Sequence, residues 1–164
     1  MRKLAGFMVL MAFVVTGCMK SNDNGTCSPQ PVAKELPLMQ KFAADSSITA
    51  TQDPTGILYE IIDPGTGTTP TATDSITINY VGRFVPNGQQ FDAGNNVTFK
   101  LSGLIEGWQI GIPKIKVGGK IKLIIQSSLA YGCTGAGNPY TDLITIPPNQ
   151  PLYFYVELLG TKPN

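Results

Sequence analysis

The chain of 164 residues contains no histidine. This absence excludes Ser-His-Asp and Cys-His nucleophilic arrangements, metal sites with histidine ligands, and proton transfer by an imidazole. Charged residues are also scarce, at 14% of the chain, and there are only three cysteines and one tryptophan. Any catalysis by this chain must therefore work without imidazole, and we expect neither a metal nor a cofactor.

The composition favours a turn-rich domain built mostly of β-strands. Hydrophobic residues make up 42% of the chain, beside 18 glycines and 13 prolines. This is too apolar for intrinsic disorder and too rich in glycine and proline for a helical bundle. The length suits one domain of ordinary size or two small ones.

The net charge gives no reason to expect a nucleic-acid partner. The formal charge is +1, but Arg2 and Lys3 lie in an N-terminal segment with the features of a signal peptide. Residues 18–164 contain ten basic and eleven acidic residues. A near-neutral chain lacks the positive potential that attracts phosphate backbones.

The first eighteen residues predict export and lipid anchoring. A basic start precedes an apolar run from Leu4 to Val15, which is too short to span a bilayer and suits a secretory signal over residues 1–17. The stretch that ends at Cys18 resembles a bacterial lipobox, which implies cleavage before Cys18 and acylation of that residue. The alternative is an ordinary signal peptide with an incidental cysteine. We expect a lipid-anchored protein of the bacterial cell envelope. Met19 and not Asp follows the cysteine, so the common inner-membrane retention signal is missing, and the sequence does not assign the anchor to one membrane.

The other two cysteines, Cys27 and Cys133, cannot form a four-ligand zinc site in a chain without histidine. In an oxidising compartment a disulfide between them is one prediction. It would close a loop of about 100 residues, worth up to about 4–5 kcal/mol in the chain-entropy model. Two unpaired thiols, or a bond to another chain, are the alternatives.

The residues after the signal divide into a tether and a helical extension. Residues 18–33 are rich in Ser, Asn, Gly and Pro and indicate a flexible tether. Residues 34–55 begin with a predicted helix over 34–46 that places Leu36, Met39 and Phe42 on one face. That face would pack on the domain's own surface; a dimerisation arm is the competing interpretation.

From residue 56 the pattern is that of an antiparallel sheet. Ile76, Ile78 and Tyr80 alternate with residues of the other face, and Pro86-Asn87-Gly88 indicates a hairpin. Further strands are predicted over 56–62, 97–101, 120–126 and 151–160. A helix of about two turns is predicted around Trp108. Residues 127–148 are expected to form a long loop. The fold class is α+β, with five or six antiparallel strands around one short helix.

Seven segments between about Gly56 and Gly160 together resemble the FKBP-type peptidyl-prolyl cis-trans isomerases. In chain order they are INYVGRF, PNGQQFDA, VTFKL, LIEGW, KVGGKIKLII, LAYG and IPPNQPLYFYVELL. The resemblance implies a half-barrel sheet wrapped around the short helix, over residues 56–162, and isomerisation of Xaa-Pro bonds in exported proteins. The tether and leading helical segment resemble those of secreted lipoprotein members.

The chemistry of that reaction agrees with the composition. Rotation about an Xaa-Pro bond breaks amide resonance, with a barrier of about 18–20 kcal/mol. A catalyst need only bind the twisted amide better than the planar one, which a dry aromatic pocket does. No nucleophile, metal or proton relay is needed.

The resemblance also implies a role for each pocket residue. Trp108 would form the floor under the proline ring. Tyr131 would donate its hydroxyl to the carbonyl of the isomerising bond, and Asp92 would hold Tyr80. The remaining expected contacts are the walls Tyr80, Phe91 and Phe154, the thinner wall Val97, the rim residues Leu104 and Ile105 with the Ile105 amide as a donor, and the cover Ile146.

Each of these residues also has a structural interpretation, because the aromatic residues could be core and Asp92 and Tyr131 could be turn and loop residues. The late loop is longer than usual in the family, which leaves substrate range and macrolide binding open. A membrane-tethered chaperone or binding module with little turnover is the alternative function. The expected partners are proline-containing polypeptides, the membrane and macrolide inhibitors, and the expected state is a monomer.

Overall fold

The fold is known from a computed structural model that describes residues 27–138 and 143–163. The predicted signal peptide, Cys18 and residues 18–26 of the tether lie outside the described residues. Six strands form one antiparallel sheet in the order β1-β2-β5-β8-β3-β4. Their bounds are β1 Thr51–Gln52, β2 Leu58–Asp63, β3 Ser75–Phe84, β4 Gln90–Lys100, β5 Lys120–Ile125 and β8 Leu152–Lys162.

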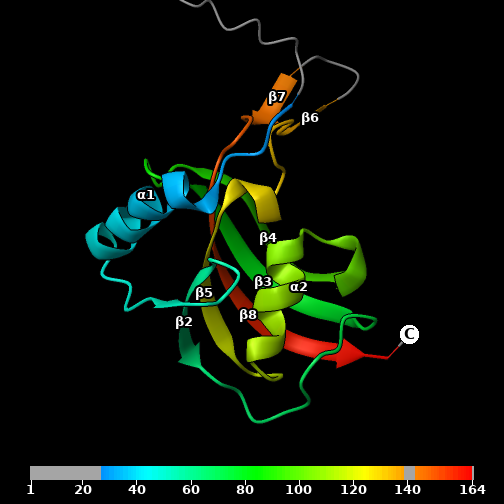
Figure 1. The fold of residues 1–164 in the computed structure, drawn as a ribbon. Coiled ribbons are helices and arrows are strands. Elements are labelled where there is room, and N and C mark those ends of the chain that lie inside the picture. Colours follow the sequence, from blue (N-terminus) through cyan, green and yellow to red (C-terminus); the bar gives the residue numbers. More distant parts are fainter. Residues whose placement is uncertain (1–26, 139–142, 164) are drawn as a thin grey trace, which may run out of the picture.

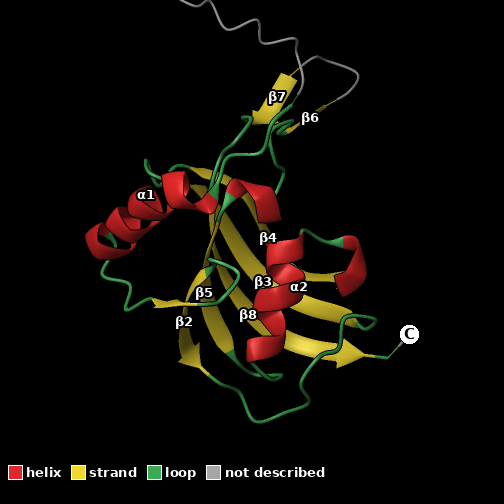
Figure 2. Cartoon of the chain, viewed as in Figure 1, coloured by secondary structure: helices red, strands yellow, loops and turns green. Residues whose placement is uncertain are grey.

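Helices cover both faces of this sheet (Figures 1 and 2). Helix α1 spans Val32–Asp45 and α2 spans Glu106–Gly111. Short 3-10 turns are η1 Leu101–Gly103, η2 Ile112–Lys114 and η3 Ser127–Leu129. Within the described ranges, no helix is long and apolar enough to cross a membrane.

The main core lies between α2 and one face of the sheet. Alternation buries every second residue of β8 on that face, from Leu152 to Leu158, as expected for a half-buried strand. Helix α2 lies close to β5 because a Cβ at Gly107 or Gly111 would come within 2.4 Å or 2.6 Å of the side chains of Ile125 and Leu123. This close packing fixes the position of Trp108 relative to the sheet.

Helix α1 covers the opposite face. Met39 and Phe42 are buried there against Leu58 and Ile124, and the ring centroid of Phe42 lies 5.5 Å from that of Tyr153. The apolar face of the helix therefore packs on the domain's own sheet. The same extension supplies β1, which pairs with β2, so the sheet begins before residue 56.

The sequence-based fold class, an α+β domain with an antiparallel sheet around a short helix, is confirmed. Two boundaries differ from the expectations. Helix α1 begins at Val32, two residues before the predicted start. The late segment expected as a loop contains a second sheet of two short strands, β6 Ala136–Asn138 and β7 Leu143–Ile146. The β-branched residues of β7 favour a strand, but the glycines and prolines around it indicate a loop.

Candidate active site

A cavity of about 200 Å³ opens on the α2 side of the sheet. Strands β3, β4 and β8 contribute Tyr80, Phe91, Asp92, Phe99 and Phe154, and the segment around α2 contributes Leu104, Ile105 and Trp108. Tyr131 comes from the loop after η3. Residues that are distant in sequence thus meet in one apolar hollow with a polar edge.

Trp108 is the centre of an aromatic cluster around the cavity. Its ring centroid lies 5.2 Å from that of Tyr80 and 5.1 Å from that of Phe154, with interplanar angles of 79° and 83°. Phe154 makes a similar contact with Phe91 at 5.7 Å. Such edge-to-face contacts stabilise each ring in one orientation. The indole is 4% exposed, and its N–H has no hydrogen-bond partner among the described residues.

Tyr80 and Asp92 form the polar edge of the cavity. The Tyr80 hydroxyl donates to Asp92 Oδ2 at 2.7 Å, and the Ala93 N–H donates to Asp92 Oδ1 at 2.9 Å. Burial, and then the hydrogen bond to the carboxylate, raise the pKa of Tyr80 well above its usual value. The phenol therefore stays protonated and its hydrogen is committed to Asp92.

Tyr131 carries the other hydroxyl at the cavity. The side chain is 38% exposed, and within the described ranges its hydroxyl makes no hydrogen bond. Burial, and then the negative charge of Asp92, raise the pKa of Tyr131. A neutral phenol with an uncommitted hydrogen can donate to a carbonyl in the cavity.

A backbone donor lies at the rim. Ile105 precedes α2, and its carbonyl accepts from the N–H of Trp108 and of Gln109. Among the described residues, no group accepts from the Ile105 N–H. The rim thus offers one amide donor beside the Tyr131 hydroxyl.

The structure brings together eight of the ten residues that the resemblance places at the pocket. They are Tyr80, Phe91, Asp92, Leu104, Ile105, Trp108, Tyr131 and Phe154.

Val97 and Ile146 do not line the cavity. Val97 pairs with Ile78 and packs at the edge of the core, and Ile146 is buried in β7 at 4% exposure. Phe99, two residues after Val97 on β4, supplies an aromatic wall that was not assigned from the sequence. Its ring centroid lies 6.4 Å from that of Tyr80. The period of two along a strand was the available signal, since it puts Phe99 on the same face as Val97.

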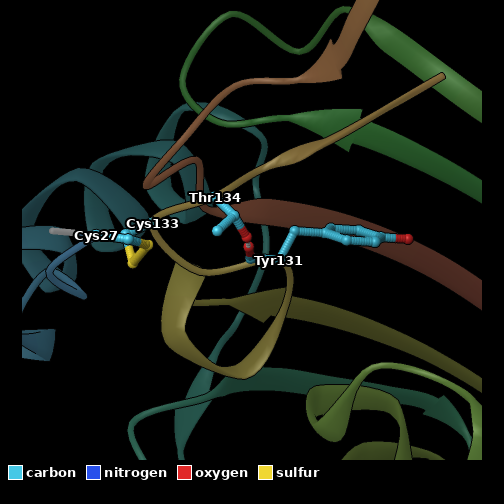
Figure 3. The surroundings of a disulfide bond; sticks show 4 residues. All are labelled: Cys27, Tyr131, Cys133 and Thr134. Atoms are coloured by element: carbon cyan, nitrogen blue, oxygen red, sulfur yellow. Dashed lines mark hydrogen bonds between the residues drawn. A yellow bond between two sulfur atoms is a disulfide. The ribbon is translucent and has the colours of Figure 1, made fainter. Parts of the chain in front are cut away.

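A disulfide joins Cys27 to Cys133, with a Cα–Cα distance of 5.3 Å across a sequence separation of 106. The structure thus has the intramolecular pairing rather than free thiols. Figure 3 shows that the bond lies on the side of the loop away from the Tyr131 ring, with the Thr134 hydroxyl donating to the Tyr131 carbonyl at 3.1 Å. The tether is therefore attached two residues from a cavity residue.

No group of three or more cysteine or carboxylate side chains that could hold a metal is present in residues 27–138 and 143–163. The described cavity offers aromatic rings, one carboxylate, one uncommitted hydroxyl and one amide N–H. This set can bind an apolar ring and orient carbonyl groups.

Comparisons with known proteins agree with this geometry. Residues 66–159 match the family of FKBP-type peptidyl-prolyl cis-trans isomerases. The protein FkpA of Escherichia coli K12 is 38% identical over 135 residues, which cover 80% of this chain and 46% of FkpA. The protein Mip of Coxiella burnetii is 36% identical over 111 residues, or 65% of this chain and 45% of Mip.

Solved structures show the same fold. The crystal structure of E. coli FkpA matches with a TM-score of 0.68 at 38% identity, over 80% of this chain and 59% of that one. A peptidyl-prolyl cis-trans isomerase from Pseudomonas syringae matches with a TM-score of 0.65 at 32% identity, over 82% of this chain and 98% of that one. This chain matches about half the length of its curated relatives. On sequence and fold together, the chain belongs to the FKBP-type peptidyl-prolyl cis-trans isomerase family.

Proposed function

We propose that this protein catalyses cis–trans isomerisation of Xaa-Pro bonds. The aromatic cavity around Trp108 is the observation that carries the proposal. Its volume of about 200 Å³ is below the roughly 300–1,000 Å³ of pockets for drug-sized ligands. It suits one prolyl ring with the bond that precedes it.

The cavity would act by preferring the twisted amide. A twisted C–N bond has lost resonance and carries less charge separation than a planar amide. An apolar cavity disfavours the planar, more polar form, which water stabilises. The Ile105 N–H and the Tyr131 hydroxyl would hold carbonyl groups on either side of the rotating bond, while Trp108 supports the ring.

The Tyr80–Asp92 pair would complete the polar edge without any proton transfer. Because the Tyr80 hydrogen is held by Asp92, the carboxylate keeps a fixed orientation toward the cavity. Selective binding of the transition state is sufficient for this reaction, since no covalent bond forms or breaks.

The substrates would be proline-containing polypeptides of the bacterial cell envelope. The signal-like segment and Cys18 support a lipid anchor, and a relative from Legionella longbeachae, 34% identical over 113 residues, is named an outer membrane protein. We also propose a monomer, because α1 uses its apolar face against its own sheet. The pocket would accept a macrolide inhibitor as well, since such a ligand inserts an apolar ring.

A tethered chaperone is the second candidate. The observation that favours it is the hairpin β6–β7, which projects from the body of the domain beyond η3 (Figure 1). A hairpin that projects from the domain could hold an unfolded chain without turnover.

One cavity variant, one control variant and two readouts separate the two candidates. Phe91→Ala removes a wall of the cavity, and Tyr155→Ala removes a partly buried aromatic residue of β8 that does not line it. Isomerisation of a short Xaa-Pro peptide and suppression of client aggregation are measured for both. The isomerase proposal expects Phe91→Ala alone to lose turnover while both variants keep aggregation suppression. Absence of turnover in the folded wild-type protein, with aggregation suppression retained, would support the chaperone instead.

A further inference from the structure

Glu35 is a buried carboxylate that makes no salt bridge among the described residues. It lies in the first turn of α1 and is only 5% exposed. Its partners are two donors of one residue, the backbone N–H of Ser127 at 2.7 Å and the Ser127 hydroxyl at 2.5 Å. Burial of a carboxylate is unfavourable unless hydrogen bonds compensate for it. A buried Glu35 therefore ties α1 specifically to Ser127.

Ser127 in turn organises the segment that carries Tyr131. It is the first residue of η3, and its carbonyl accepts from the N–H of Ala130 at 3.0 Å and of Gly132 at 2.7 Å. These two amides flank Tyr131 in the chain. A chain of hydrogen bonds therefore runs from Glu35 through Ser127 to the backbone on both sides of the cavity tyrosine.

Docking of α1 alone does not account for this arrangement. Met39 and Phe42, further along the helix, already bury its apolar face on the sheet. Apolar contacts of this kind need no buried carboxylate. Glu35, near the start of α1, instead contacts Ser127, which precedes Tyr131 in the loop. The Cys27–Cys133 disulfide holds the same loop at a residue that follows Tyr131.

We propose that Glu35 is a positioning residue, which holds Tyr131 in place at the cavity by fixing Ser127. The inference rests on the proposed isomerase function, in which the Tyr131 hydroxyl contacts the substrate. The disulfide is a second attachment of the same loop.

A double-mutant cycle tests the coupling. The full chain, purified in detergent, carries Glu35→Ala, Tyr131→Phe or both, and kcat and KM are measured for isomerisation of a short Xaa-Pro peptide. We expect each single variant to lower kcat/KM by about threefold to tenfold, as for one hydrogen bond. In the Tyr131→Phe background, Glu35→Ala should have no further effect. Glu35→Gln should restore part of the loss, because its carboxamide oxygen still accepts from the Ser127 N–H.

The control is Met39→Ala, which weakens the docking of α1 through apolar contacts alone. We expect it to lower the melting temperature and to leave kcat/KM of the folded protein unchanged. If Met39→Ala lowers kcat/KM as much as Glu35→Ala, or if Glu35→Ala has the same effect with and without the Tyr131 hydroxyl, the positioning role is wrong.

A readout that does not depend on turnover keeps the two proposals separate. Hydrogen exchange at the Ala130 and Gly132 amides should accelerate in Glu35→Ala and not in Met39→Ala. Unchanged exchange in Glu35→Ala would overturn the inference. Accelerated exchange in a protein that has no isomerase activity would instead show that the proposed function fails while the structural coupling stands.

Discussion

Tyr80 and Asp92 form a hydrogen-bonded polar pair at the edge of a largely aromatic cavity. The hydroxyl–carboxylate hydrogen bond of 2.7 Å has an ionised acceptor, and such bonds contribute more than neutral ones. Two roles for Asp92 are distinguishable at this scale. It either orients the Tyr80 ring or presents its negative charge to the bound amide.

Removal of either partner separates these roles. We expect Asp92→Ala to lower kcat/KM for an Xaa-Pro peptide by about tenfold or more, and Tyr80→Phe by less. The reason is that Tyr80→Phe keeps both the ring and the charge, whereas Asp92→Ala removes the charge from the cavity edge. Equal losses in steady-state assays of the two folded variants would contradict a direct electrostatic role and leave only orientation of the ring.

The pocket roles of Trp108, Phe91 and Phe154 are implied by the family resemblance and not by the apolar pattern, which fits ordinary core packing equally well. Their elements present all three side chains to the core side, where they line the cavity. Val97 and Phe99 share one face of β4, and the apolar pattern does not distinguish them. Which of the two reaches the cavity depends on how β4 pairs with β3. The register shifts between Ile78 and Tyr80, and a bulge of this kind has no local signal in the sequence.

At the scale of elements, an ion pair connects the turn before β2 with η2. The Lys114 ammonium lies 2.5 Å from Asp53 Oδ2 and 4.7 Å from the centroid of the Tyr59 ring. The hydrogen bond from Lys114, followed by those from Thr55, lowers the pKa of Asp53 from 3.8 to about 2. This pair holds the chain that follows α2 against the edge of the sheet.

The ion pair makes stability depend on pH in the acid range. A carboxyl whose pKa is lower in the folded state stabilises the fold above its unfolded pKa, and this contribution disappears as the pH falls from about 5 to 2. At about 1.4 kcal/mol per pKa unit, the contribution is up to about 2 kcal/mol. We expect urea unfolding to show a smaller acid-induced loss in Lys114→Met than in the wild type.

The matched control is Lys41→Met, which removes an exposed pair with Asp45 on α1. Surface pairs contribute little, so its pH profile should follow that of the wild type. Parallel acid profiles for the wild type and Lys114→Met would contradict the role of the buried pair.

Helices and strands also differ in how well the sequence predicts them. Long strands and α1 follow from the spacing of apolar residues, because these residues recur on the face that packs in a core. The hairpin β6–β7 does not, since three or four residues between glycines and prolines carry too little periodicity. The attachment of Glu35 to Ser127, 92 positions away, is equally invisible in the sequence, because it depends on how the completed fold brings the two together.

At the scale of the whole molecule, the Cys27–Cys133 disulfide connects the first described residue, ahead of α1, to the loop after η3. It closes a loop across 106 positions. A long loop restricts the unfolded chain strongly, by about 4–5 kcal/mol in the chain-entropy model. The bond therefore stabilises the domain as a whole in addition to holding the late loop.

Reduction should lower the free energy of unfolding by several kcal/mol, measured by urea unfolding with and without dithiothreitol. A Cys27→Ser/Cys133→Ser variant should resemble the reduced wild type and be insensitive to the reductant. An unfolding midpoint that is the same for the oxidised protein and for the double variant would contradict this account.

We propose that an aromatic cavity suffices for isomerisation of Xaa-Pro bonds in a chain without histidine. The most direct measurement is the exchange rate between the cis and trans forms of a short Xaa-Pro peptide, followed by NMR with the purified protein and with Trp108→Leu. Circular dichroism verifies that both proteins are folded. We predict clear acceleration by the wild type and at least a tenfold smaller kcat/KM for Trp108→Leu, because the floor of the cavity is lost. A folded wild-type protein that leaves the exchange rate at its uncatalysed value would contradict the claim.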